Sequence, residues 1–197
     1  MPPRRLVVAT RNDHKLRELA EILRGVELVP LAAGVELPPE DGETFADNAL
    51  IKARAAYRAT GEPALADDSG IVARALGGRP GVRSARYAGA DAGDEENLAL
   101  LLRELNRTAD RHLAYVCVIA YVDEHGGEEL FEGRCEGELA AEPRGTGGFG
   151  YDPAFVPADT GDDRTMAELD PSEKHAISHR GRAARALAAH LGLEPQP

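Results

Sequence analysis

The chain of 197 residues is long enough for one sizeable domain and short for two independent ones. With 43% hydrophobic and 29% charged residues, it has a globular composition, which excludes a disordered or fibrous protein. A net charge of −11 repels nucleic-acid backbones, so we expect no nucleic-acid partner. No apolar run approaches membrane-spanning length, and the first residues do not resemble a signal peptide. We therefore expect no membrane partner and a cytoplasmic location.

Hydrophobic periodicity predicts strands and helices that alternate along the first half of the chain. The predicted strands cover residues 5–10, 27–31, 63–66, 113–122 and 131–139, and a further apolar run covers 71–76. Four helices are predicted: the first two end near residues 24 and 61, and the other two cover residues 94–105 and 178–191. Thr44 is the predicted N-cap of the second helix, and Ser178 that of the last. Cys117 and Cys135 fall inside the later strands, which favours buried thiols over a disulfide or a metal site.

These elements predict an α/β fold with a mixed sheet and flanking helices. The first half alternates strand and helix, whereas the second half contains a long antiparallel hairpin that turns at residues 124–127. No linker divides the chain. We expect a single domain over residues 1–197, with two lobes around a cleft, and a frayed tail at 194–197.

The basic residues are nearly all arginine, with 20 Arg against three Lys among the 23 cationic residues. Lysine carries a compact ammonium, which differs from the flat guanidinium of arginine in how it binds anions. Two explanations are open for the positions of the three lysines, Lys15, Lys52 and Lys174. Each lysine marks a place where an ammonium is needed, or the positions reflect chance.

Residues 10–15, Thr-Arg-Asn-Asp-His-Lys, join a buried strand to the start of a helix. Phosphates bind well at such a point, because unpaired backbone N–H groups and the helix dipole point outward there. Thr10 and Asn12 can donate hydrogen bonds, and Lys15 can reach a phosphate oxygen. The segment is not a P-loop, and a plain capping turn is the alternative.

Acidic residues occur in two places that suit a metal ion. Asp67 and Asp68 directly follow a predicted strand, and Glu40 and Asp41 lie in a loop before the second helix. Carboxylates at a sheet edge can hold Mg²⁺ against phosphate oxygens. Adjacent side chains of an extended chain point in opposite directions, so only one of Asp67 and Asp68 is expected to face a cleft. A capping turn is again the alternative.

Residues 145–150 match G-x-G-x-x-G, but Pro153 follows and forbids the helix that a dinucleotide-binding fold requires there. A loop of this kind allows a planar base to approach the backbone, with Phe149 or Tyr151 stacking on it and Asp152 accepting from a ring N–H. An ordinary glycine loop is the alternative.

His179 and Arg180 open the last predicted helix. Both can donate to a purine O6, which hypoxanthine and xanthine carry and adenine does not. This contact would discriminate against adenine but not against guanine. Solvated first-turn residues are the alternative.

Taken together, the segments resemble one family, the inosine/xanthosine triphosphate pyrophosphatases. Six motifs carry the resemblance in order along nearly the whole chain: Thr10-x-Asn12-x-x-Lys15, Thr44-Phe45-x-x-Asn48-Ala49 with Lys52, Ala66-Asp67-Asp68-Ser69-Gly70, Pro80-Gly81-Val82-x-Ser84-Ala85-Arg86, Gly147-Gly148-Phe149-Gly150-Tyr151-Asp152-Pro153, and Ser178-His179-Arg180.

The resemblance implies an elongated mixed α/β fold with a central cleft, a homodimer, and Mg²⁺-dependent hydrolysis of ITP, dITP and XTP. Cleavage would fall between the α- and β-phosphates, releasing the monophosphate and pyrophosphate and so cleansing the nucleotide pool. Arg11 departs from the small residue that many members carry at its position, so it would either tighten phosphate binding or partly block it.

The resemblance also implies the roles of particular residues. Asp68 matches the catalytic proton acceptor, and the metal ligands are Glu40 and Asp68, although Asp41 remains an alternative to Glu40. The residues implied to bind substrate are Thr10, Arg11, Asn12, Asp13, His14, Lys15, Lys52, Ser69, Phe149, Gly150, Tyr151, Asp152, Lys174, His179 and Arg180.

Two other functions compete with this one. A Maf-like pyrophosphatase would act on other modified nucleotides, but the motifs at residues 149–152 and 178–180 argue against it. A non-enzymatic nucleotide-binding protein would not need to assemble Glu40, Asp67 and Asp68 beside a polyanion.

Overall fold

The structure is a computed structural model that describes residues 5–193. These residues form two compact units, each assembled from separate stretches of the chain. Unit 1 comprises residues 5–68, 117–133 and 180–193, and unit 2 comprises 69–116 and 134–179. The predicted tail at 194–197 lies outside the described residues, and the single-domain assignment stays a prediction.

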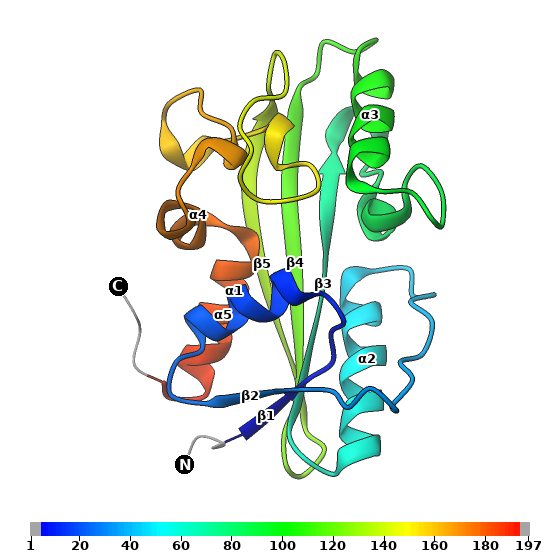
Figure 1. The fold of residues 1–197 in the computed structure, drawn as a ribbon, viewed down its shortest axis with the longest axis vertical. Helices are drawn as coiled ribbons and strands as arrows, with labels where there is room; N and C mark the ends of the chain where they lie inside the picture. The colour runs from blue at the N-terminus through cyan, green and yellow to red at the C-terminus, as the bar shows by residue number, and fades with distance from the viewer. Residues whose placement is uncertain (1–4, 194–197) are drawn as a thin grey trace. The chain divides into compact units, whose positions relative to one another are not determined.

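Five α-helices and six strands make up the fold, together with short 3₁₀ turns, within residues 5–193 (Figure 1). The strands are β1 (Arg5–Val8), β2 (Glu27–Pro30), β3 (Ala64–Ala73), β4 (His112–Val122), β5 (Glu128–Leu139) and β6 (Phe155–Pro157). The helices are α1 (Asp13–Ile22), α2 (Phe45–Thr60), α3 (Asp94–Leu105), α4 (Pro171–Ile177) and α5 (His179–His190).

The strands form one sheet in the order β2-β1-β3-β4-β5-β6. The strand β1 pairs in parallel with β2 and β3, placing Val7 opposite both Val29 and Ala64. In contrast, β5 pairs antiparallel with β6, with Leu139 opposite Phe155. The predicted mixed sheet is therefore confirmed.

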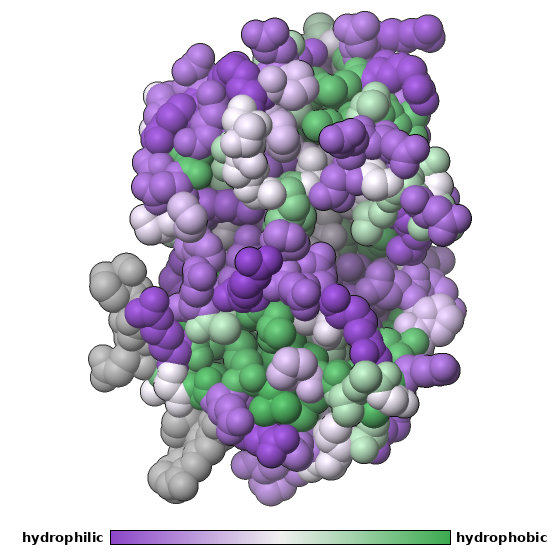
Figure 2. Space-filling model, in the orientation of Figure 1, coloured by the Kyte–Doolittle hydropathy of each residue, from purple (hydrophilic) through white to green (hydrophobic). Residues whose placement is uncertain are grey.

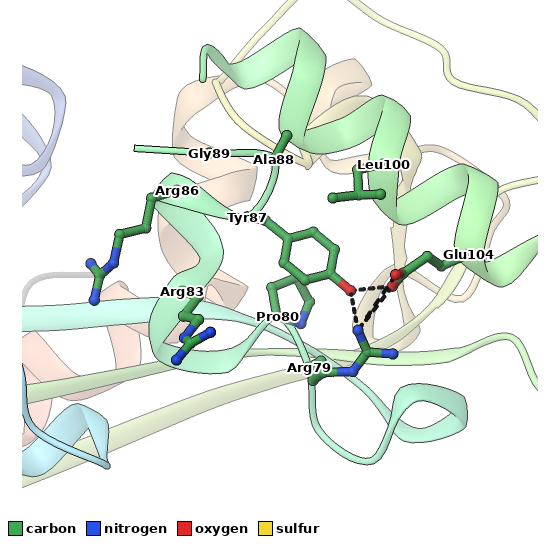
Figure 3. A pocket seen from close by; sticks show the side chains of 9 residues that line it. All are labelled: Arg79, Pro80, Arg83, Arg86, Tyr87, Ala88, Gly89, Leu100 and Glu104. Carbon is green, nitrogen blue, oxygen red and sulfur yellow. Dashed lines mark hydrogen bonds and ion pairs between the residues drawn. The ribbon is translucent and has the colours of Figure 1, made fainter. Parts of the chain in front are cut away.

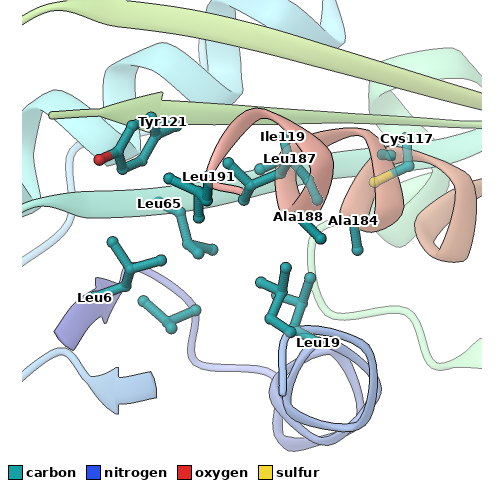
Figure 4. Packing of buried hydrophobic residues seen from close by; sticks show 13 residues of the cluster. Leu6, Leu19, Leu65, Cys117, Ile119, Tyr121, Ala184, Leu187, Ala188 and Leu191 are labelled. Atoms are coloured by element: carbon teal, nitrogen blue, oxygen red, sulfur yellow. The ribbon is translucent and has the colours of Figure 1, made fainter. Parts of the chain in front are cut away.

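Alternating side chains of the unit 1 strands feed two separate apolar clusters. Leu6 and Leu65 belong to a cluster completed by α1 and α5 (Figure 4). Val7 and Ala66 belong to the other cluster, which α2 completes with Ala49, Ala53 and Ala56. Because successive strand residues point to opposite faces, α2 covers one face of the sheet in unit 1, and α1 and α5 cover the other (Figure 1).

The start of α2 matches the capping signal in the sequence. Thr44 accepts a hydrogen bond from the Asp47 amide, and the Asp47 carboxylate accepts one from the Thr44 amide. This capping box satisfies two backbone donors at the helix start. The helix ends at Gly61, whose φ of +67° is the left-handed conformation that glycine adopts readily. The capping box therefore sets the residue at which the helix carrying Asn48 and Lys52 begins.

Unit 2 has its own apolar cluster. Leu101 and Leu105 of α3 pack there with Tyr115 of β4 and Phe155 of β6. The rings of Tyr115 and Phe155 meet edge to face with centroids 4.8 Å apart. The second half of the chain thus has a hydrophobic core of its own.

Two parts of the predicted secondary structure were wrong. The strand predicted to end at residue 66 continues through Asp67 and Asp68 as β3, because both carboxylates have buried partners that an extended chain can reach. Residues 171–177 form a separate helix, α4, which begins at a capping box between Asp170 and Glu173. Ser178 has extended backbone between the two helices: it is the C-cap of α4, and it also occupies the predicted N-cap position, directly before α5 begins at His179.

Part of the unit 1 apolar cluster reaches the surface. Figure 2 shows hydrophilic residues over α1 and a patch of apolar residues beside them over β1 and β2. Four apolar side chains that pack on the cluster from this region are only partly buried: Leu16, Ile22, Val26 and Leu28.

Within residues 5–193, no helix combines the length and the apolar character that crossing a membrane requires.

Gly70 predicts a stability effect, because β3 runs very close to the 3₁₀ turn Gly81–Arg86 at this residue. A Cβ at position 70 would lie 2.6 Å from the Gly81 carbonyl oxygen and 2.9 Å from the Ser84 Cβ. We expect Gly70→Ala to lower the free energy of unfolding by roughly 1–3 kcal/mol through overpacking. Each kcal/mol corresponds to a fall in Tm of about 2–4 °C for a chain of this size.

The matched control is Gly34→Ala, because a Cβ at position 34 meets no atom within 4 Å. Thermal melts of both variants test the prediction, and equal melting temperatures for Gly70→Ala and the wild type would contradict it.

Candidate functional site

The turn between β1 and α1 is built by its own side chains. Asn12 is the N-cap of α1, and its Oδ1 accepts hydrogen bonds from the amides of His14 (2.9 Å) and Lys15 (3.2 Å). The Thr10 hydroxyl oxygen accepts from the Asn12 amide at 3.1 Å. The predicted strand-to-helix turn is confirmed, with Asp13 in the first helical turn and Lys15 two residues further on.

The side chain of Arg11 points to the loop after β2. Its Nη2 donates to the carbonyl oxygen of Val35 at 2.6 Å. The guanidinium is thus engaged by the protein's own backbone and ties this loop to the turn before α1.

Asp67 forms ion pairs with Lys15 and Arg180 on the sheet face covered by α1 and α5. Its Oδ2 lies 3.1 Å from the Lys15 ammonium and accepts from Nε and Nη2 of Arg180, each at 3.2 Å. Burial favours the protonated carboxyl, but Lys15, Arg180 and Lys52 outweigh it and hold the pKa of Asp67 well below its usual range. The other oxygen, Oδ1, is buried and has no hydrogen-bond partner among residues 5–193.

Asp68 follows on β3 and has different partners. Its Oδ2 accepts a hydrogen bond from Nδ2 of Asn48 at 3.0 Å, and Oδ1 of Asn48 accepts one from the Gly42 amide at 2.8 Å. Burial raises the pKa of Asp68, and the negative charge of Glu40 raises it further, against the opposing effects of Lys52, Lys15 and Asn48. The two adjacent carboxylates therefore serve different sets of partners, as the alternation of an extended chain predicts.

Lys52 connects the α2 side of unit 1 to β3. Its ammonium donates to Oε1 of Glu40 at 2.5 Å and to the backbone carbonyl of Asp67 at 2.7 Å. Burial alone would lower the pKa of Lys52, but the charges of Asp67, Glu40 and Asp68 raise it, so the side chain carries a full positive charge. Glu40 is partly buried in this contact, whereas the neighbouring Asp41 is exposed.

In unit 2, Asp152 organises a second group of polar side chains. Its Oδ1 accepts from the Tyr115 hydroxyl at 2.9 Å, and its Oδ2 accepts from the Lys174 ammonium at 2.9 Å and the Phe149 amide at 3.0 Å. The Lys174 ammonium also lies 4.9 Å from the centroid of the Phe149 ring. His179 stacks on Tyr115 with ring centroids 4.6 Å apart and planes 7° from parallel.

The two aromatic candidates for base stacking, Tyr151 and Phe149, differ in how deeply their side chains are buried. Tyr151 is 5% exposed and donates its hydroxyl hydrogen to the Ser84 carbonyl at 2.8 Å. Phe149 is only partly buried. The Gly150 amide donates to Asp94 at 2.8 Å, and Ser69 is partly buried on β3. Phe149 is therefore the ring better placed to accept a further partner.

The structure distributes the predicted site residues over both units. Unit 1 holds the turn at residues 10–15, Glu40, Lys52, Asp68 and Arg180, and unit 2 holds Ser69, residues 149–152, Lys174 and His179. Arg180 contacts Asp67 and Glu18, so it differs from its sequence neighbour His179 in both unit and partners. The substrate, metal and catalytic roles of all these residues stay predictions. No group of three or more His, Cys, Asp or Glu residues within 5–193 is arranged to hold a metal ion.

Sequence reasoning missed four residues of these groups: Glu18, Asn48 as a partner of Asp68, Tyr115 and Cys117. Strand alternation could have placed Tyr115 on one face of β4, but only the fold reveals that Asp152 lies at its hydroxyl. Cys117 lies with its Sγ 3.9 Å from Oδ2 of Asp67, and burial raises the pKa of this thiol to about 12. The thiol is therefore neutral beside a charged carboxylate.

Unit 2 also contains a pocket of ≈ 390 Å³ that none of the predicted site residues line (Figure 3). Arginines 79, 83 and 86 surround it, but their guanidinium groups do not converge. That of Arg79 is bonded to Tyr87 and Glu104, while those of Arg83 and Arg86 point elsewhere (Figure 3). The pocket therefore lacks the arrangement of an anion site.

Comparison with known proteins identifies the family. The Ham1 family model matches residues 6–190. A dITP/XTP pyrophosphatase of Geobacter sulfurreducens is 52% identical over 196 residues, covering 96% of this chain and 98% of that one. One of Symbiobacterium thermophilum is 54% identical and covers 93% and 92%. A HAM1 protein structure from Coxiella burnetii has a TM-score of 0.88 at 45% identity and covers 95% and 98%. The resemblance found in the sequence is thereby confirmed, and the chain belongs to the Ham1 family.

Proposed function

We propose that this protein hydrolyses the non-standard purine nucleoside triphosphates ITP, dITP and XTP to the monophosphate and pyrophosphate. The observation that carries the proposal is the assembly of Lys15, Lys52 and Asp68 around β3 in a chain whose relatives bear the name dITP/XTP pyrophosphatase. Buried cations beside carboxylates suit a polyanion and a metal ion together.

Lys15 and Lys52 would neutralise the triphosphate. Each ammonium is held by the protein, Lys15 by the buried carboxylate of Asp67 and Lys52 by the partly buried Glu40 and the Asp67 carbonyl. Preorganised cations stabilise the charge that develops on a pyrophosphate leaving group without reorganising at the moment of reaction. The Thr10 hydroxyl and the Asn12 side-chain NH₂ would add hydrogen bonds to phosphate oxygens, since the amides of Asn12, His14 and Lys15 are engaged within the turn.

The unit 1 residues also fit a divalent metal ion such as Mg²⁺. Four carboxylates (Glu18, Glu40, Asp67, Asp68) and three cations (Lys15, Lys52, Arg180) interact there, which leaves an excess of negative charge. Carboxylate oxygens are the ligands that Mg²⁺ prefers in proteins. Glu40 and Asp68 would hold the metal, which would polarise phosphate oxygens.

Asp68 would orient the attacking water and accept its proton. The hydrogen bond from Asn48 fixes one carboxylate oxygen, and the Gly42 amide fixes Asn48 in turn. Burial raises the pKa of Asp68, which makes it a stronger base than an exposed aspartate. Its position therefore suits a base that must stay in one orientation.

The base of the nucleotide would be held by the Asp152 group of unit 2. Phe149 offers a partly buried ring face, and Asp152 and Lys174 offer an acceptor and a donor that already hold each other. His179 is fixed by stacking on Tyr115. Stacking with polar contacts at the base edge is how proteins commonly hold an unpaired base.

Three further features belong to the proposal through the family resemblance and the sequence: a homodimer, a cytoplasmic location and the absence of a nucleic-acid partner. Light scattering of the purified protein tests the first. A single mass of 21.0 kDa would exclude the dimer.

The activity is tested with a nucleotide panel. ITP, dITP, XTP, GTP, ATP and modified pyrimidine triphosphates are incubated with enzyme and Mg²⁺, and pyrophosphate and orthophosphate are measured separately. We expect pyrophosphate release, fastest from ITP, dITP and XTP. A site that hydrogen-bonds O6 can reject ATP by up to roughly 10⁴–10⁵-fold. Preference for the pyrimidine nucleotides would favour the Maf-like alternative, and binding without hydrolysis would favour the non-enzymatic one.

Asp68→Asn should nearly abolish turnover while the fold persists, because it removes the proton acceptor and weakens metal binding. We expect kcat to fall on the order of 10²–10⁴-fold. The matched control is Asp91→Asn, an exposed aspartate of unit 2. Turnover of Asp68→Asn within threefold of the wild type would exclude Asp68 from the mechanism.

Phe149→Leu should weaken nucleotide binding without affecting the phosphate cations. Base stacking on an aromatic ring contributes roughly 1–3 kcal/mol, so we expect the KM for ITP to rise while inhibition by inorganic tripolyphosphate, which has no base, stays unchanged. Phe131→Leu on β5, another partly buried phenylalanine, is the control. Equal loss of tripolyphosphate binding would show that Phe149 supports the phosphate contacts instead.

A further inference from the structure

The loop at residues 145–152 carries Phe149, and its backbone turns beside this ring. The Phe149 amide donates to Oδ2 of Asp152 at 3.0 Å. The next residue, Gly150, has a φ of +63°, the left-handed conformation that glycine adopts readily. Because the backbone on both sides of a residue sets the direction of its side chain, the placement of the ring depends on what holds the Gly150 amide.

An acidic side chain from another element holds this amide. Asp94 is the exposed first residue of α3, and its Oδ2 accepts a hydrogen bond from the Gly150 amide at 2.8 Å. The two residues lie 56 positions apart in the chain. A carboxylate accepts a hydrogen bond more strongly than a neutral oxygen does. Asp94 therefore ties the loop to α3 directly beside the ring that is proposed to stack on the base.

The part of α3 that carries Asp94 is itself fixed to the 3₁₀ turn Gly81–Arg86. Asn97 is 2% exposed, and its Nδ2 donates to the Ala85 carbonyl of that turn at 3.3 Å. The same turn also accepts the hydroxyl hydrogen of Tyr151, at the Ser84 carbonyl. The turn and the start of α3 thus support both of the residues that follow the ring.

We propose that Asp94 is a positioning residue for base binding, which holds the Gly150 amide so that the Phe149 ring is in place before a nucleotide arrives. The proposal rests on the proposed function, in which Phe149 stacks on the base. A loop that adopts its binding conformation only part of the time lowers the apparent affinity by that fraction. Loss of the Asp94 contact should therefore weaken ligands that have a base and spare those without one.

The test compares Asp94→Ala, which removes the acceptor, with Asp94→Asn, which keeps a neutral acceptor oxygen. Calorimetry measures the affinity for inosine monophosphate, which has a base, and for inorganic tripolyphosphate with Mg²⁺, which has none. We expect Asp94→Ala to weaken inosine monophosphate binding and raise the KM for ITP by roughly three- to tenfold. Tripolyphosphate affinity and kcat should stay at the wild-type values, because the contact contributes only to binding of the base. Asp94→Asn should recover most of the loss.

Amide hydrogen exchange followed by NMR measures the contact without any ligand. In Asp94→Ala the Gly150 amide should exchange faster, on the order of tenfold, because it loses a charged acceptor. The Gly147 amide donates to the Ala167 carbonyl at 3.0 Å and should keep its wild-type rate, so it is the internal reference. Exchange and calorimetry need no turnover, so they test this proposal even if the nucleotide panel shows no hydrolysis.

Two controls isolate the Asp94 contact. Glu95→Ala removes an exposed carboxylate from the same first turn of α3, so it reproduces any lost interaction with the helix dipole. It should leave Gly150 exchange and inosine monophosphate affinity unchanged. In a Phe149→Leu background, Asp94→Ala should have almost no further effect on inosine monophosphate affinity, because its effect passes through the ring.

Several results would overturn the proposal. Unchanged Gly150 exchange in Asp94→Ala would show that the contact does not hold the loop in solution. Faster exchange with unchanged inosine monophosphate affinity would show that the contact does not serve base binding. Equal losses of inosine monophosphate and tripolyphosphate affinity, or an equal effect of Glu95→Ala, would show general damage. A full Asp94→Ala effect in the Phe149→Leu background would break the link to the ring.

Discussion

The buried carboxylate of Asp67 is the interaction on which unit 1 depends. A carboxylate removed from water is costly unless cations and donors surround it, and here Lys15 and Arg180 meet the same oxygen. These partners come from α1 and α5, so one charge ties two helices to β3. The proposed phosphate site is thus built into the packing of the unit, and its cations are ordered before any ligand arrives.

Because successive side chains of β3 point in opposite directions, its two neighbouring aspartates contact different partners. Asp67 faces the helices α1 and α5, and Asp68 contacts Asn48 of α2. Lys52 links the two sides, because it binds the backbone carbonyl of Asp67 from α2 and pairs with Glu40. A one-residue shift in the register of β3 would exchange the partners of the two carboxylates.

Unit 2 uses the same principle with different chemistry. Asp152 is the buried acceptor there, and Tyr115 and Lys174 satisfy it from β4 and α4. Because Lys174 also lies over Phe149, the aromatic ring and the charged pair are fixed together. Each unit therefore has one aspartate that orders the residues proposed to bind the nucleotide.

The sequence by itself determined the mixed sheet, the capping box of α2, the turn before α1 and the family, because these depend on local periodicity, on short-range hydrogen bonds and on motifs in order. It could not determine that β3 continues through two aspartates, because burial of the two carboxylates decides that point. The separate helix α4 was missed although its start carries a local signal, the capping box of Asp170 and Glu173. Only the tertiary structure decided the partners of Arg180. Asp67 lies 113 residues earlier in the chain, and no spacing rule relates side chains so far apart until packing brings them together.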